Sequence, residues 1–95
     1  MKARKVWKYP FHPDLEPQTR EMPEGAKFLT AQAQGSAIMA WFEVDQDMPR
    51  CERTFQTLWT GNSIVPEGAV YLATVQLPPL VWHLYELAEG GASCA

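Results

Sequence analysis

Residues 66–87 read Pro-Glu-Gly-Ala-Val-Tyr-Leu-Ala-Thr-Val-Gln-Leu-Pro-Pro-Leu-Val-Trp-His-Leu-Tyr-Glu-Leu. The segments on either side of Pro78-Pro79, residues 70–77 and 80–87, are rich in β-branched and aromatic residues, which favour strands. Pro66-Glu67-Gly68 favours a β-turn, because proline suits its second position and glycine its fourth. The stretch therefore predicts a tight turn followed by a β-hairpin.

A similar pattern lies 43 residues earlier in the chain. Pro23-Glu24-Gly25-Ala26 corresponds to Pro66-Glu67-Gly68-Ala69. Gly35-Ser36 favours a tight turn between strands expected at 28–34 and 37–45. We therefore expect two equivalent hairpins. Repeat halves at 4–45 and 53–87 would explain them, although a shared turn and ordinary β alternation would produce a similar match.

Three further segments, residues 5–9, 18–22 and 53–60, also read as strands, and hardly any segment has helical periodicity. The chain has 95 residues, of which 46% are hydrophobic, so one domain with its own core is expected. Frequent turns between short strands predict an all-β fold. We expect a single antiparallel β-sandwich or barrel-like domain of six to seven strands over residues 1–87, followed by a flexible tail at 88–95.

Composition excludes several classes of protein. No apolar run approaches the roughly 20 residues that a membrane helix needs, and the basic N-terminus leads into no signal-peptide core. The net charge of −3 argues against a general nucleic-acid binder. Two cysteines, Cys51 and Cys94, are too few for a disulfide framework. We therefore expect a protein of the reducing cytoplasm.

Period-two alternation assigns the hairpin strands to faces. One face is expected to contribute the core residues Ile38, Phe42, Val81 and Leu87. The opposite face contains two tryptophans and is too apolar to be left to water. Another sheet, a partner or a ligand should cover it. Together with the basic edge at Lys5, Trp7 and Lys8, this face supplies the expected partner-binding residues: Trp7, Met39, Trp41, Trp82 and Leu84.

A second candidate site follows strand 53–60. Arg53 could bind a phosphate or carboxylate, Trp59 could stack on a ring, and Thr60 and Asn62 could donate hydrogen bonds beside the flexible Gly61. A strand that ends in an ordinary turn explains the same residues. These four residues form the alternative, ligand-binding prediction.

No motif points to catalysis. Cys51 lies beside arginines that would favour its thiolate, but no positioned base accompanies it in the sequence. His12, Asp14 and Glu16 are too few, and of the wrong type, for a structural zinc site. We therefore expect no catalytic residue, no metal and no cofactor.

The chain resembles a family of small proteins from phages and their bacterial hosts that is classed as a domain of unknown function. The resemblance covers residues 5–87 and is carried by six motifs: Val6-Trp7-Lys8-Tyr9-Pro10, Met22-Pro23-Glu24-Gly25-Ala26, Trp41, Arg53-Thr54-Phe55, Thr60-Gly61-Asn62-x-Ile64 and Val81-Trp82-His83-Leu84-Tyr85-Glu86. In that family the position of Asn62 is often histidine, so a role that needs an imidazole there is in doubt.

The resemblance implies a mobile-element origin and brings no catalytic residues. It favours a counter-defence inhibitor, such as an anti-CRISPR protein, that binds a host defence protein. An oligomer that sequesters a nucleotide second messenger is the alternative, with the apolar face forming the dimer. A structural or regulatory phage component is a third possibility.

Overall fold

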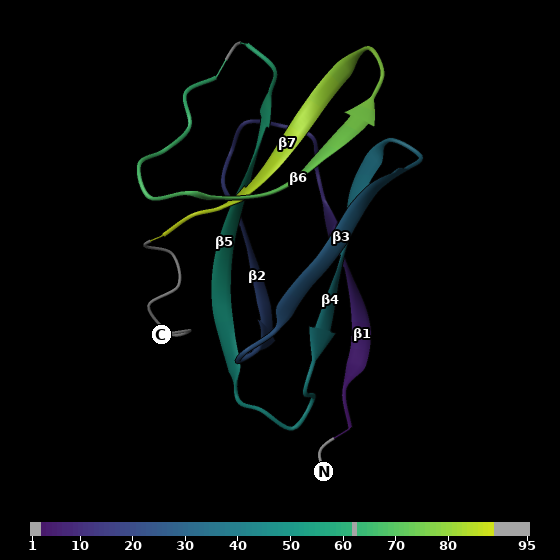
Figure 1. The fold of residues 1–95 in the computed structure, drawn as a ribbon, viewed down its shortest axis with the longest axis vertical. Coiled ribbons are helices and arrows are strands. Elements are labelled where there is room, and N and C mark those ends of the chain that lie inside the picture. Colours follow the sequence, from purple (N-terminus) through teal and green to yellow (C-terminus); the bar gives the residue numbers. More distant parts are fainter. Residues whose placement is uncertain (1–2, 62, 89–95) are drawn as a thin grey trace.

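Seven antiparallel strands in two sheets form the protein in a computed structural model, which describes residues 3–61 and 63–88 (Figure 1). No described residue is helical. The predicted all-β sandwich is confirmed, and the sheets do not close into a barrel. The three-stranded sheet has the order β1 (Lys5–Phe11), β4 (Ala37–Val44), β3 (Lys27–Gln34); the four-stranded sheet has the order β2 (Gln18–Pro23), β5 (Arg50–Trp59), β7 (Leu80–Glu86), β6 (Val70–Leu77).

Two strand boundaries differ from the predicted ones by more than one residue. β1 continues through Pro10 to Phe11. This is possible because β1 is an edge strand that pairs only with β4, so no strand on its other side needs the N–H that proline lacks. β5 begins at Arg50, three residues earlier than expected, where it pairs with Pro23 of β2. Most of the expected tail, residues 89–95, lies outside the described residues.

The two predicted hairpins, β3–β4 and β6–β7, are equivalent in form. Each has a register shift at the same point of its first strand, at Leu29 and at Leu72. Each follows a turn that contains a glycine with positive φ, 85° at Gly25 and 81° at Gly68. This backbone conformation is accessible to glycine at little cost. The correspondence seen in the sequence therefore extends to backbone geometry, while a duplication origin stays a prediction.

The two hairpins turn opposite faces toward the core. In β4 the predicted core residues Ile38 and Phe42 are fully buried. In β7 the prediction is wrong: Val81 lies on the outer face and is only half-buried, as is Leu87 just beyond the strand. Instead Trp82 and Leu84 fill the interior, with exposed fractions of 5% and 1%. They are therefore corrected from partner-binding residues to core residues.

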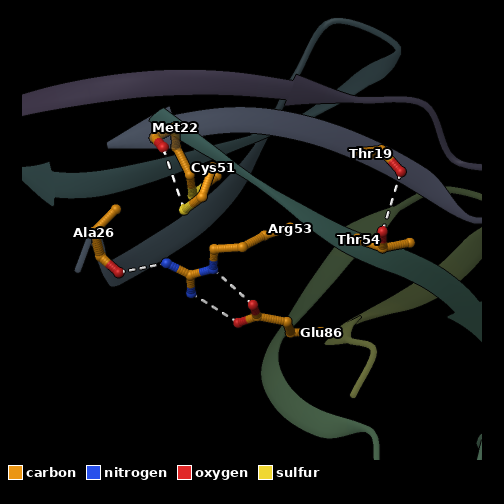
Figure 2. Close-up of polar contacts among 7 residues, drawn as sticks. All are labelled: Thr19, Met22, Ala26, Cys51, Arg53, Thr54 and Glu86. Atoms are coloured by element: carbon orange, nitrogen blue, oxygen red, sulfur yellow. Dashed lines mark hydrogen bonds and ion pairs between the residues drawn. The ribbon is translucent and has the colours of Figure 1, made fainter. Parts of the chain in front are cut away.

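An ion pair in the interior accounts for this reversal (Figure 2). Arg53 Nε and Nη2 donate to the two carboxylate oxygens of Glu86 at 2.6 and 2.8 Å, and Nη1 donates to the carbonyl oxygen of Ala26 at 2.6 Å. The Arg53 guanidinium also lies 5.6 Å from the ring centre of Phe42, in the opposite sheet. Because Glu86 points inward to reach Arg53, alternation directs Leu84 and Trp82 inward as well.

A second arginine joins the sheets at β1 and β2. Arg20 Nε and Nη2 donate to the carbonyl oxygen of Pro10 at 3.0 and 2.8 Å, and the guanidinium lies over the Phe11 ring at 4.8 Å. Burial lowers the pKa of Arg20 from its ordinary value. The free edge of β1 thus lacks an N–H at Pro10, and its carbonyl there is already bound.

The aromatic core is centred on Phe42. Its ring makes edge contacts with Tyr9, Phe28 and Phe55 at centroid distances of 5.5, 5.6 and 5.9 Å. Burial raises the pKa of Tyr9, and the nearby Arg50 and Arg53 partly offset that increase. The contacts join β1, β3 and β4 to β5, so one ring connects the two sheets.

We predict that Glu86→Gln destabilises the protein by about 2–3 kcal/mol, because it leaves the partly buried Arg53 guanidinium without its carboxylate. Urea unfolding measures the loss. The matched control is Arg4→Gln, since the Arg4–Glu43 pair is far more exposed, with side-chain exposures of 47% and 39% against 14% and 23%. That control should cost less than about 0.5 kcal/mol. Equal losses in the two variants would contradict a structural role for the Arg53–Glu86 pair.

We also predict that Trp82→Ala costs about 3–5 kcal/mol of unfolding free energy, because it empties a large volume in the core. Trp41→Ala should cost about 1 kcal/mol or less, because Trp41 lies on the outer face of β4. Urea unfolding of both variants compares the two tryptophans directly. A larger loss for Trp41→Ala would overturn the assignment of faces.

Candidate functional site

The outer face of the three-stranded sheet contains a regular grid of side chains around one tryptophan. On β4, Met39, Trp41 and Glu43 point away from the core. Each lies between one residue of β1 and one of β3. The rows across the sheet are Pro10–Met39–Gln32, Lys8–Trp41–Thr30 and Val6–Glu43–Lys27. We call these nine residues the Trp41 face.

No other element among residues 3–61 and 63–88 covers the Trp41 face. Its three β4 residues are half-buried by their neighbours within the sheet, and the six residues from β1 and β3 are all exposed. Val6 has an exposed fraction of 57%. The large ring of Trp41 therefore lies at the centre of a flat surface, with the thioether of Met39 on the same strand. Such an aromatic anchor within a polar rim is typical of protein interfaces.

Charge on this face is mostly positive. Lys8 and Lys27 are exposed, and Arg4 lies just before β1. The single carboxylate, Glu43, forms an ion pair with Arg4 at an N–O distance of 3.2 Å. It also lies opposite Lys27 in the pairing of β4 with β3. Lys8 Nζ makes a long contact of 3.4 Å with the Gln34 amide oxygen. The face therefore has a cationic rim, although the chain as a whole has a net charge of −3.

The predicted partner-binding residues do not all come together. Met39 and Trp41 share the Trp41 face, as expected. Trp7 instead points toward the core beside Phe42 and is half-buried, with the Arg50 guanidinium 5.3 Å from its ring centre. Trp82 and Leu84 are interior residues of the other sheet. The alternation argument found the correct face of β4 and the wrong face of β7.

The alternative ligand-binding residues are also dispersed. Arg53 is engaged by Glu86, and Trp59 packs against Trp82 with a centroid distance of 5.4 Å. Arg53 and Trp59 are six residues apart on one strand, which separates them by about 20 Å at the usual rise. Thr60 bonds to His83, and Asn62 lies outside the described residues. No enclosed pocket is found among the described residues.

Sequence reasoning missed a hydrogen-bonded chain on the outer face of the four-stranded sheet. The alternation that places Val81 in the core predicts an inward His83 as well, but His83 faces outward and is half-buried. Its Nε2 lies 2.8 Å from the Thr60 hydroxyl, and its Nδ1 lies 2.9 Å from the Thr74 hydroxyl. Thr74 in turn bonds the Tyr71 hydroxyl at 2.7 Å. These hydrogen bonds connect the end of β5 to β6 through His83, and both imidazole nitrogens have a hydrogen-bond partner.

The remaining sequence candidates give no reactive centre. Cys51 is buried and disulfide-bonded, a bond that the sequence did not predict, and its sulfur lies 3.5 Å from the Met22 carbonyl oxygen (Figure 2). A thiolate nucleophile at Cys51 is thereby removed.

Within residues 3–61 and 63–88 no three His, Cys, Asp or Glu side chains are grouped as metal ligands would be. Nor is there a helix in that part of the chain that could cross a membrane.

Comparison with known proteins gives a family and no function. No curated protein and no solved structure matches the chain. Residues 2–93 match the model of a family described as a domain of unknown function, DUF7352. The match covers nearly all of the 95 residues, including both hairpins and the whole Trp41 face. The chain therefore belongs to the DUF7352 family.

Proposed function

We propose that this chain is a non-catalytic binding protein that uses the Trp41 face to occupy the surface of a partner protein. In this proposal it is encoded by a phage or another mobile element, and the partner is a component of a host defence system that is inhibited by being bound. The single observation that carries the binding role is the uncovered Trp41 at the centre of a nine-residue face. The defence partner is supported only by the resemblance to small phage-type proteins.

The energetic argument for binding at this face is the desolvation of the indole ring. Aromatic rings bury a large area when a partner covers them, and Trp is among the residues that dominate interface energies. Met39 beside it can adapt its shape to a partner because its side chain is flexible and unbranched. Exposed Lys8, Thr30 and Gln32 would supply the polar rim.

The geometry favours this role over sequestration of a nucleotide. A small ligand is usually held in a concave site with a few convergent polar groups. The predicted ligand residues do not converge, since Arg53 and Trp59 each have an intramolecular partner. A flat, aromatic-centred face suits the surface of a protein better.

We predict that Trp41→Ala weakens capture of the partner by at least about thirtyfold, which corresponds to roughly 2 kcal/mol for a central aromatic anchor. Immobilised wild-type and variant chains would be incubated with lysate of the host cell, and the captured proteins identified and quantified by mass spectrometry. A concentration series then gives the affinity for the main captured protein.

The matched control is Ile64→Ala, because Ile64 is 90% exposed and lies in the loop after β5, away from the three-stranded sheet. That variant should capture as much as the wild type. Undiminished capture by Trp41→Ala would exclude the Trp41 face as the contact surface. A captured protein whose defence activity is unchanged by the bound chain would exclude the inhibitor role.

A further inference from the structure

The cations of the Trp41 face outnumber its acids. Glu43 is the only carboxylate among the nine residues, and Arg4 already pairs with it at 3.2 Å. No acid lies in the same row as Lys8, which continues to Trp41 of β4 and Thr30 of β3. Lys8 and Lys27 are therefore exposed cations beside a half-buried indole, at positions where a partner could supply the counter-charges.

Two carboxylates face each other on the outer face of the other sheet. On its outer face, Glu21 of β2 lies directly opposite Glu52 of β5, and both side chains are exposed. Like charges placed opposite each other across a strand pair repel. The outer face of one sheet thus carries the lysines of the Trp41 face, and the outer face of the other sheet carries this pair of carboxylates. This separation of charge would orient an approaching charged partner before contact.

Two kinds of polyanion could match this rim, and the side chains favour a protein. Surfaces that bind single-stranded nucleic acid present successive aromatic rings, one for each stacked base, along a basic groove. The Trp41 face has one aromatic ring, is flat and includes a carboxylate. A single indole ringed by two separate lysines instead matches an apolar spot flanked by Asp or Glu side chains.

We propose that the partner surface docked on the Trp41 face is an acidic protein surface, with carboxylates opposite Lys8 and Lys27 around an apolar spot that receives Trp41. This inference rests on the proposed binding function and specifies the chemistry of its partner. It predicts that binding is steered by charge and weakens with salt.

Poly-L-glutamate is the probe for the acidic surface, and the readout is the indole N–H resonance of Trp41 in the ¹⁵N-labelled protein, assigned by its absence in Trp41→Phe. Poly-L-glutamate should shift this resonance at about 0.1 M salt, and the shift should disappear near 1 M, where the screening length falls from about 10 Å to about 3 Å. The double variant Lys8→Glu/Lys27→Glu should bind about tenfold more weakly, from two lost exposed pairs.

Arg50→Glu is the matched control for each single reversal, Lys8→Glu or Lys27→Glu, because it too removes one cation and adds one anion, but on a strand of the other sheet. It should change the affinity for poly-L-glutamate by less than about twofold, well below the effect of the double variant. Tighter binding of an oligothymidylate of about 20 nucleotides at the same resonance would overturn the proposal in favour of nucleic acid. A Trp41 shift that depends only on protein concentration would overturn it in favour of a second copy of the chain.

Two results distinguish a failure of the acidic-surface inference from a failure of the proposed binding function. If Trp41→Ala abolishes capture of the partner from lysate while Lys8→Glu/Lys27→Glu and high salt leave capture unchanged, the acidic-surface inference fails and the binding function stands. If Trp41→Ala leaves capture unchanged, the proposed contact surface fails, whatever poly-L-glutamate does.

Discussion

A guanidinium and a carboxylate placed between the two sheets determine how this sandwich is assembled. Removing either ion from water is expensive unless geometry and hydrogen bonds compensate. Here Arg53 uses three nitrogens, two for Glu86 and one for the Ala26 carbonyl. Because Ala26 precedes β3 and Glu86 lies on β7, Arg53 of β5 connects the turn that begins the first hairpin to the strand that ends the second (Figure 2). The register between β5 and β7, and the inward face of β7, are both compatible with that pair.

The same pair decides which tryptophan is left for a partner. The two hairpins have equivalent backbones, with matching register shifts at Leu29 and Leu72. Glu43 has no interior arginine to meet, so it points outward, and Trp41 points outward with it. Glu86 does meet an interior arginine, so Trp82 is drawn into the core. Two hairpins of equivalent form thus differ in that the first has a tryptophan, Trp41, on its outer face and the second has a tryptophan, Trp82, in the core.

Local features of the fold could be predicted from the sequence, whereas the parity of β7 could not. The turns at residues 23–25 and 66–68, the hairpin at Gly35-Ser36 and the β4 core residues follow from glycine, proline and alternation. For β7, alternation leaves two faces, and both are apolar enough to be buried. Equivalence with the first hairpin then selected the wrong one, and Arg53, the residue that meets the inward Glu86, is 33 residues away. His83 was misplaced by the same reversal.

Only part of the candidate site could therefore be predicted from the sequence, because the predicted face of β7 was reversed. Met39 and Trp41 were found because their strand obeys simple alternation, while Trp82 and Leu84 were added by analogy with a hairpin that packs the other way round. The lysines that surround Trp41 come from two other strands, and only the pairing of β1 and β3 with β4 brings them to one face. The sequence shows that the N-terminal segment is cationic. It does not show that Lys8 of this segment lies next to Trp41 in the sheet.

The edges of the three-stranded sheet also bear on how a partner would approach. An exposed edge strand can add a strand from another chain. In β1, Pro10 has no N–H to offer and its carbonyl already accepts from Arg20. In β3, the register shift at Leu29 interrupts the regular spacing of backbone groups along that edge. Both edges are thus poor templates for strand addition, whereas the face between them presents an indole ring that β4 holds in place. Docking onto this sheet is therefore expected to use side chains on its face and not backbone groups at its edges.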